Sequence, residues 1–510
     1  MLIEHWFRYI CPMISTFDSE INYNRRLARS AWDTSKPVFY TMQVMSAIWL
    51  ADSTPQLKSS LPLLRMQAAD AINQDISHIR RAEVAKVTAD LVFAVFMLGT
   101  SLHWSNSVTT VPEHPWLELA RDLLSIWKSD LSALDVLFYS YFCQALTYWK
   151  MLVAAADRGS DPGEPDWRWQ QHQTRSAMPL QDDNPDDIVI YGPLPYDSGQ
   201  SLLGTRPNSW CGVSDEVIDV FRQVMALCRN VCDRRRTRNS LAEALTNSDL
   251  SEAHLAHELQ RVLLSMDFSD LIQRETVQGF PVQTRDENTP VSHLLQTAEA
   301  YRLASLLQLQ LTFKGLTISS WDVHCGFKSA ATPYDNTTTY GMAIAHDQHH
   351  GEVLLALTLQ LVKTLEGIPA QSGSRSIHAI LYLSAAAGLR LEKSPPEATS
   401  GDTSGLATIE QADQSTPGTS QPAFAIPHHS YQHIPLDTTY STNSSIPASA
   451  LEVSRARSLV LARLSSLQRT LPNRTTDSTL QLVQSIWREY DSSRSDSCCM
   501  HWLDIMVRCN

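Results

Sequence analysis

The chain contains 510 residues, of which 43% are hydrophobic, and it carries a formal net charge of −13 at pH 7. This length permits a large core, and a content of 13 tryptophans is typical of a folded protein rather than a disordered one. Acidic residues outnumber basic ones by 54 to 41, whereas a DNA-binding surface needs clustered lysine and arginine to displace counterions. The composition therefore excludes a disordered chain and argues against charge-driven binding of nucleic acid.

The cysteines and the apolar segments indicate the compartment. Nine cysteines are scattered along the chain, which favours free thiols in a reducing compartment over a disulfide framework. The N-terminal residues MLIEHWFRYICP mix charged and aromatic side chains and lack the apolar core of a signal peptide. The most apolar stretch, residues 91–102, is too short to span a bilayer. We therefore expect a soluble cytosolic or nuclear protein without a membrane partner.

Helical periodicity dominates the first block, residues 1–156. Between residues 40 and 50, apolar side chains recur every three or four positions and share one helix face, namely Tyr40, Val44, Ala47 and Ile48. Residues 157–208 are instead rich in Asp, Pro, Gly and Gln. Because this segment lacks the periodicity needed to bury a face, we expect a long loop or a disordered insert there.

The second block contains two further predicted helices. Ser214 is a suitable N-cap for the first, whose core side would carry Val217, Phe221, Val224, Cys228 and Val231. Its last turns hold Arg229 and residues 234–236, all arginine, which suits the negative end of a helix dipole. The second helix covers residues 293–313, with a stripe of Leu294, Ala298, Tyr301, Ala304, Leu307 and Leu311. From Leu303 onward it is apolar nearly all round, which predicts burial inside a larger bundle.

The C-terminal part begins with a second predicted insert. Residues 394–449 are rich in Ser, Thr and Pro and contain few apolar side chains, so we expect a loop or a disordered segment. Two helices follow, the first lined by Val453, Ala456, Val460, Leu464 and Leu467 and the second by Leu480, Val483 and Trp487. Strand signals are sparse and no fixed-period repeat is visible. The sequence thus predicts an all-α domain over residues 1–510, a multi-helix bundle or array with two long inserts.

The strongest catalytic candidate is the segment DDNPD, which contains Asp182, Asp183 and Asp186. Such clustered carboxylates hold magnesium against a diphosphate in helical terpenoid cyclases and prenyltransferases, since hard cations prefer oxygen ligands. However, the motif needs a rigid helix, and Pro185 interrupts this segment. No second metal motif accompanies it. A solvated acidic loop is favoured, and a magnesium-dependent cyclase or prenyltransferase-like enzyme is kept as the alternative.

Two other groups could ligate a metal, but each has a simpler interpretation. His346, His349 and His350 have helix-face spacing, with His324 and Cys325 nearby in sequence. Zinc needs three or four such ligands with a fixed second shell, and no closely spaced cysteine pair is present, so polar helix or loop histidines are favoured. The second group is Cys228 and Cys232, which lie one helical turn apart. Their thiols fit the role of small core residues better than that of metal ligands. Cys498 and Cys499 are expected to be structural or exposed thiols. We assign no catalytic, cofactor or metal residue.

One short basic run has two interpretations. The sequence DRRRTR, residues 233–238, could be recognised by a nuclear import receptor. A solvated helix end is the favoured alternative, because short basic runs are common. The nucleus is therefore not established by this run alone.

Four stretches resemble one known family, and they occur in the family's order. They are LIEHWFRYICPMISTFDSEINYNRR at 2–26, RPNSWCGVSDEVIDVFRQVMALCRNV at 206–231, AEAYRLASLLQLQLTF at 298–313, and RARSLVLARLSSLQ at 455–468 followed by VQSIWREYD and HWLDIM at 483–491 and 501–506. Together they resemble the fungal-specific transcription factor domain, the regulatory region of fungal zinc-cluster activators. That resemblance implies an all-helical nuclear regulator of RNA polymerase II transcription, without catalytic residues.

The resemblance also implies partners. They are the transcription machinery or coregulator proteins, a small effector bound in an apolar cleft between helices, and a second copy of the chain; the regulated genes would belong to a metabolic or secondary-metabolite pathway. The family's DNA-reading module starts with Cys-x-x-Cys, which does not occur here. DNA would then be reached indirectly or through a module upstream of Met1. A helical-repeat adaptor without a nuclear role is a further alternative.

Overall fold

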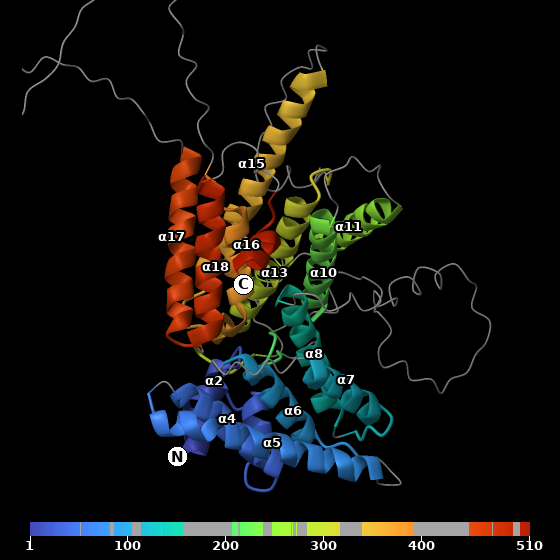
Figure 1. Cartoon of the computed structure of the whole chain (residues 1–510), viewed down its shortest axis with the longest axis vertical. Coiled ribbons are helices and arrows are strands. Elements are labelled where there is room, and N and C mark those ends of the chain that lie inside the picture. The colour runs from blue at the N-terminus through green and yellow to red at the C-terminus, as the bar shows by residue number, and fades with distance from the viewer. Residues whose placement is uncertain are drawn as a thin grey trace, which may run out of the picture.

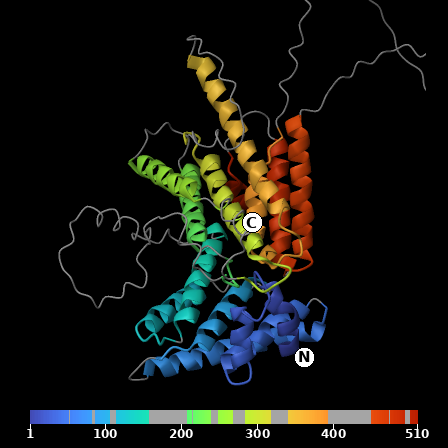
Figure 2. The same ribbon diagram turned by 180° about the vertical axis from the view of Figure 1, so that it is seen from behind.

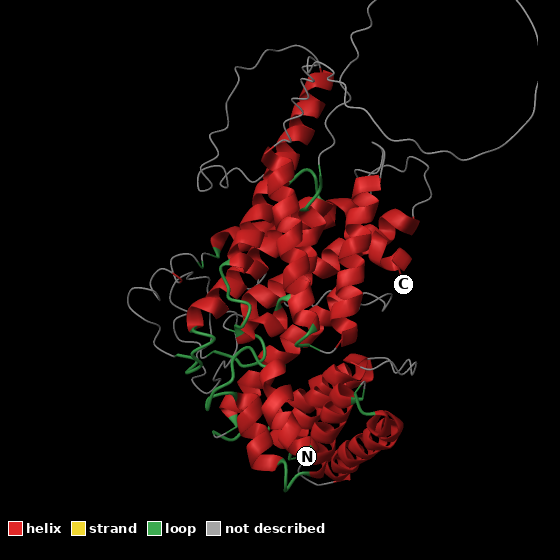
Figure 3. Ribbon diagram, turned by 90° about the vertical axis from the view of Figure 1, so that its left-hand side faces the viewer, coloured by secondary structure: helices red, strands yellow, loops and turns green. Residues whose placement is uncertain are grey.

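The computed structural model describes most of the chain. The described residues are 1–51, 53–81, 86–104, 114–133, 135–156, 207–212, 215–237, 247–266, 268, 272, 283–316, 339–391, 448–471, 473–492 and 500–509. Within them every regular element is a helix (Figure 3). Asn208 and Gly212 form an isolated β-bridge. The predicted all-α fold is confirmed.

The helices form two lobes, which Figures 1 and 2 show from opposite sides. The N-terminal lobe comprises α1 (Leu2–His5), the π-helix η1 (Trp6–Ile10), α2 (Cys11–Met13), α3 (Tyr23–Ala31), α4 (Lys36–Leu50), α5 (Pro55–Arg81), α6 (Ala89–Ser101), the 3-10 turn η2 (Leu102–Trp104) and α7 (His114–Lys128). Its long helices lie across the view in Figure 1, below the more upright helices of the other lobe.

The C-terminal lobe comprises α10 (Asp215–Thr237), α11 (Asn247–Ser265), α13 (Val291–Thr312), α15 (Thr339–Glu366), the 3-10 turn η4 (Gly373–Ile377), α16 (Ala379–Gly388), α17 (Ala448–Gln468), α18 (Asn473–Ser492) and α19 (Trp502–Cys509). Helix α8 (Val136–Ala156) joins the lobes, because it packs against α6 and α7 as well as α10. Some helices that lie far apart in sequence are in contact, such as α10 and α19. In a repeat array, by contrast, each unit touches only its neighbours.

The core of the N-terminal lobe is built around α6. Residues 91–98 are all buried, as expected for a helix that is apolar on every side. The ring of Phe96 contacts those of Phe142, Trp149 and Trp210. A Cβ at Gly99 would lie 2.3 Å from the Trp149 ring, so the glycine permits the close approach of α6 and α8.

Helix α13 is the centre of the C-terminal lobe. It packs against α10, α15, α16 and α11, and every residue from 303 to 310 is buried. The prediction that this segment lies inside a bundle is confirmed. The predicted core faces of α10 and α17 are also buried throughout. Helix α10 begins one residue after Ser214, which itself lies outside the described residues.

The two predicted inserts, 157–208 and 394–449, lie mostly outside the described residues, and their boundaries differ slightly from the structure. Pro207 and Asn208 already belong to a buried turn, and α17 begins at Ala448. Local composition could not place the first boundary, because the partners that bury Asn208 come from a distant segment. In the described part of the chain no helix is both long and apolar enough to cross a bilayer.

Candidate functional site: the polar joint between the lobes

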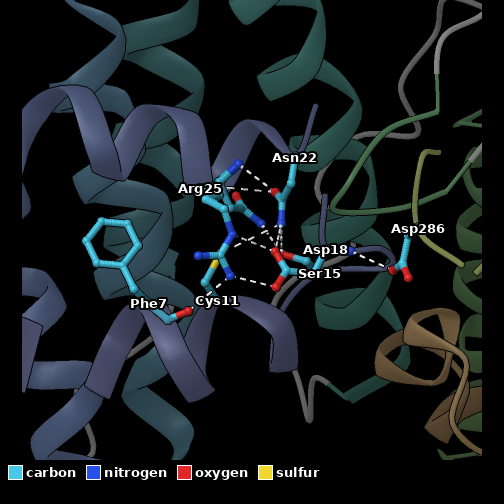
Figure 4. Close-up of polar contacts among 8 residues, drawn as sticks. Phe7, Cys11, Ser15, Asp18, Asn22, Arg25 and Asp286 are labelled. Atoms are coloured by element: carbon cyan, nitrogen blue, oxygen red, sulfur yellow. Dashed lines mark hydrogen bonds and ion pairs between the residues drawn. The ribbon is translucent and has the colours of Figure 1, made fainter. Parts of the chain in front are cut away.

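Residues 14–25 run along the boundary of the two lobes and contact a turn at 207–212 and a loop at 283–290. We call these three segments together the joint. A proline leaves one backbone carbonyl at the joint without a helical donor. Cys11 continues the π-helical ladder by donating its N–H to the carbonyl of Trp6, so the next donor would be Pro12, which has no N–H. The carbonyl of Phe7 is left free, and the Arg25 Nη2 donates to it at 3.0 Å (Figure 4).

The same arginine holds a carboxylate. Arg25 Nε and Nη2 lie 2.7 and 2.6 Å from the two oxygens of Asp18, a bidentate geometry that fixes both side chains. The hydrogen bond to Asp18 raises the pKa of the Arg25 guanidinium. The guanidinium therefore stays charged, and its bonds to Asp18 anchor the loop between α2 and α3 to the start of α3.

Asn22 organises the centre of the joint. Its side-chain oxygen accepts from the backbone N–H of Asn24 at 2.9 Å and so caps α3. Its Nδ2 donates to Ser15 Oγ at 3.0 Å, and Asn24 Nδ2 donates to the same hydroxyl at 3.0 Å. The hydroxyl of Tyr141 on α8 donates to Asn24 Oδ1. Buried polar groups from three elements thus satisfy one another.

The turn at 207–212, which precedes α10, connects the start of the C-terminal lobe to this centre. Thr16 donates its N–H to the carbonyl of Ser209 at 2.8 Å and its hydroxyl to that of Asn208 at 2.9 Å. The hydroxyl of Ser209 accepts the N–H of Tyr23 at 3.2 Å. Gly212 closes the turn with φ at 93°, a conformation that favours glycine. Two segments that lie far apart in sequence are joined through their backbones.

The loop at 283–290 completes the joint from α13. The N–H of Asp18 donates to Asp286 Oδ2 at 2.9 Å, and Ser19 Oγ donates to the carbonyl of Thr284 at 2.6 Å. Thr289 Oγ1 accepts the N–H of Gly373 at 2.8 Å, at the start of η4. Hydrogen bonds therefore connect the lobes here, beside buried apolar side chains such as Phe17 and Trp210.

Burial also sets the chemistry of the ionisable groups in the joint. It raises the pKa of the Cys11 thiol to about 12 and that of the Tyr141 hydroxyl well above its ordinary value. Both groups stay protonated at neutral pH, so Cys11 does not supply a thiolate. The arrangement is suited to holding two lobes in one relative position.

The predicted metal and catalytic candidates fall mostly outside the described residues. This applies to Asp182, Asp183, Asp186, His324, Cys325, Cys498 and Cys499, and to the side chains of His346 and His349 on α15. His350 is described and is half-buried. In the described ranges, no group of three or more His, Cys, Asp or Glu side chains converges as a metal site would require.

Cys228 and Cys232 are core residues, as the sequence indicates. Both are buried, and Cys228 Sγ donates to the carbonyl of Gln308 at 3.5 Å. Burial raises the pKa of each thiol to about 12. They pack α10 against α13 and α19 as small apolar side chains.

The basic run at the end of α10 connects helices to one another. Arg234 pairs with Glu252 and, at 3.2 Å, with Asp249 on α11. Arg235 Nη2 donates to the carbonyl of Thr312 at 2.9 Å, and Arg236 lies 3.2 Å from Asp504 on α19. Arg238 lies outside the described residues. These side chains satisfy helix ends and carboxylates within the lobe.

Arginines elsewhere cap other helices in the same way. Arg229 Nη2 donates to the carbonyl of Ala155 at the end of α8, at 2.6 Å. Arg457 Nη2 donates to Leu389 after α16 at 2.7 Å, and Arg463 Nη2 donates to Ile368 after α15 at 2.9 Å. The last carbonyls of a helix lack partners within it and carry its negative dipole end. Arginines that lie off the apolar stripes of α10 and α17 thus bind neighbouring helices together.

Comparison with known families identifies the chain. A sequence model described as the fungal specific transcription factor domain matches residues 1–334 and 446–510. The chain belongs to this family. No curated protein and no solved structure matched it. The match therefore includes the N-terminal lobe and the C-terminal lobe apart from α15, η4 and α16, and it contains all the stretches that carried the resemblance.

This membership separates the hypotheses. A transcription factor domain supports a transcription regulator, and the family is one of non-enzymatic regulators that generally act in the nucleus. The alternative of a magnesium-dependent cyclase finds no support in the match. The two stretches at 2–26 and 206–231 are the ones that meet in the joint, so the joint lies within the matched part of this transcription factor domain.

A small cavity lies beside the joint in the transcription factor domain. It is lined by Cys211, Val217, Ile218, Leu294, Thr297, Ala298 and Tyr301, and its volume is about 10 Å³. That is room for about one water molecule. This cavity does not fit the small effector that the resemblance implies.

The joint was not predicted from the sequence, although one signal for it was available. Asn22 precedes an amphipathic segment and is a favourable N-cap, which would have placed the start of α3. Nothing local indicates that Asn24 would meet Tyr141 or that Thr16 would meet Ser209. These contacts depend on how the lobes come together.

Proposed function

We propose that this chain is a nuclear regulator of RNA polymerase II transcription that acts by binding partners. The match to the fungal specific transcription factor domain over both lobes carries this proposal. Its partners are coregulator proteins or the transcription machinery, and a second copy of the chain is a further candidate. The regulated genes belong to a metabolic or secondary-metabolite pathway.

The joint is the element through which we propose that binding alters activity. A ligand changes a conformational equilibrium only when it binds one state better than the other. The support for the joint is its bonding: residues 14–25, 207–212 and 283–290, which come from different parts of the chain, are connected by hydrogen bonds. A partner that contacts both lobes would favour one relative position.

DNA is reached through a separate module or a partner. The chain has a net charge of −13, and the arginines at the end of α10 are paired with helix ends and carboxylates. Purified chain should therefore show no sequence-specific binding to DNA with the steep salt dependence of phosphate contacts. Tight specific binding by the chain alone would contradict this part of the proposal.

A tethering experiment tests the function itself. The full chain is fused to a heterologous DNA-binding module, and transcription of a reporter with the matching site is measured in a fungal cell. We expect the reporter transcript to differ from that obtained with the module alone, and a fluorescently tagged chain to collect in the nucleus. An unchanged reporter together with a fusion excluded from the nucleus would overturn the proposal.

A further inference from the structure

Helix α10 ends at an exposed hydroxyl that follows three consecutive arginines. Thr237 is the last residue of the helix, and its side chain is exposed. Its Oγ1 donates to the carbonyl of Arg234 at 3.0 Å. Since the final turn of a helix lacks part of its hydrogen-bond ladder, it opens more readily than the middle of the helix.

The three arginines before this hydroxyl hold three different elements. Arg234 holds α11 through Asp249 and Glu252, with side-chain exposures of 23% for the arginine and 18% and 14% for the acids. Arg235 caps α13, and Arg236 contacts α19 through Asp504. A new anion placed among these guanidinium groups would compete directly with the carboxylates.

The geometry points to Thr237 as a phosphorylation site for an arginine-directed serine/threonine kinase. Kinases select substrates partly by complementary charge, and the guanidinium groups of Arg234 and Arg235 stand three and two positions before the hydroxyl. They lie with the acceptor oxygen in the last turn of α10, so opening of that turn presents all three groups to the kinase. The substrate is thus the chain itself, and the co-substrate is ATP with magnesium.

The transfer balances without a further reactant. Thr237 Oγ1 forms a bond to the γ-phosphorus of ATP while the bond from that phosphorus to the bridging oxygen of ADP breaks. The hydroxyl proton passes to the kinase's base, and ADP leaves. The product carries about two negative charges at neutral pH and three acceptor oxygens.

Phosphorylation would redistribute the arginines. Residues three apart share a helix face, so the phosphate would lie beside the guanidinium of Arg234 and draw it from Glu252 on α11. It would also face Asp233 one turn earlier, and that acid pairs with Arg236. Arginine forms bidentate, charge-assisted hydrogen bonds with phosphate as it does with carboxylate. We infer that the modification loosens α11 first and α19 second.

A second hydroxyl provides a matched control within the chain. Ser458 is exposed and follows Arg455 and Arg457, so it also has an arginine three positions before it. However, it lies in the middle of α17, and its hydroxyl donates to the carbonyl of Ser454 at 3.0 Å. The kinase needs local unfolding to reach Ser458, whereas at Thr237 it needs only the last turn.

The test uses the purified full chain, an arginine-directed kinase and magnesium ATP. Mass spectrometry locates the phosphate in the unmodified sequence and in the variants Thr237→Ala and Ser458→Ala. We expect phosphate on Thr237, its loss in Thr237→Ala, and no change in Ser458→Ala. Incorporation at Ser458 without Thr237, or no incorporation at Thr237, would overturn the assignment.

Hydrogen exchange then tests the consequence. Peptides from α11 should exchange about tenfold faster after phosphorylation, because local opening is then opposed by fewer charge-assisted bonds. Peptides from α17 should not change. Phosphate on Thr237 with unchanged exchange in α11 and α19 would overturn the proposed release. Neither measurement needs a transcriptional readout, so failure here is distinguishable from failure of the proposed function.

Discussion

The joint and helix α13 each contain a bidentate arginine–carboxylate pair, but their surroundings differ. In the joint, the side chains of Arg25 and Asp18 keep 21% and 25% of their exposure. On α13, those of Arg302 and Glu299 keep 10% and 7% and lie one turn apart on one helix. Water screens the first pair more than the second. The same chemistry thus anchors the loop between α2 and α3 at the joint and completes the core of one lobe at α13.

The uncharged polar groups follow the same division. On α13, the hydroxyls of Ser305 and Thr312 donate to the carbonyls four residues earlier in their own helix. In the joint, the hydroxyl of Thr16 donates to Asn208, on a segment far away in sequence. These two hydroxyls of α13 are satisfied wherever the helix forms, whereas the bond from Thr16 to Asn208 forms only after distant segments have met. We therefore expect the joint to open at a lower free energy than the lobe.

The largest effect should come from breaking the buried pair. Replacing Arg302 by alanine leaves Glu299 as an uncompensated charge in the core, which costs about 3–5 kcal/mol. Urea unfolding followed by circular dichroism measures the loss. In the double variant Arg302→Ala/Glu299→Ala no charge is stranded, so it should lose less than Arg302→Ala alone. A loss below about 1 kcal/mol for Arg302→Ala would remove the distinction between the two regions.

Acid should weaken the C-terminal lobe through two buried histidines. Burial lowers the pKa of His378 and of His501 from 6.5 to about 3. Between these values the unfolded chain binds more protons than the folded one, so stability is full above pH 6.5 and falls as the pH decreases toward 3. At pH 5 the loss is about 2 kcal/mol for each histidine.

Urea midpoints measured from pH 7.5 to 5 check this dependence. His378→Asn should make the loss of stability with acid shallower. His254→Asn, at an exposed position on α11, should leave the slope unchanged. Equal slopes in all three proteins would show that His378 does not contribute.

A smaller effect is expected for the half-buried pair in the joint. Arg25→Ala removes both bonds to Asp18 and the bond to the Phe7 carbonyl, and we expect a loss of about 1 kcal/mol in global stability. Hydrogen exchange should increase within residues 14–25 and 207–212 and remain unchanged in α13. Faster exchange throughout α13 would mean that the joint and the lobe unfold together.

An effect of similar size should come from a wedge between the lobes. A Cβ at Gly373 would lie 2.6 Å from the carbonyl oxygen of Thr16, so Gly373→Ala must separate η4 from the joint, at a cost of about 1 kcal/mol. At Gly315 an added Cβ meets nothing within 4 Å, which makes Gly315→Ala the matched control. Equal thermal midpoints for the two variants would contradict tight contact at the joint.

Periodicity predicted the helices well because it reports a local property. The spacing of Val217, Phe221 and Val224 places them on one face of α10 regardless of what covers that face. The same reasoning predicted burial for Leu307 on α13. It could not predict the use of Arg457 or Arg463, because an arginine outside an apolar stripe looks the same whether it faces water or the end of another helix.

From the sequence alone, the all-α class, the position of the main helices and the sides that face the core were determined, since each depends on residues within a few turns of one another. The tertiary structure alone decided that Thr16 meets Ser209, that Asp18 meets Asp286, and that arginines of α10 and α17 bind the ends of other helices. The physical reason is range. Hydrogen bonds and ion pairs form between atoms a few ångströms apart, and only folding brings such distant residues within that distance.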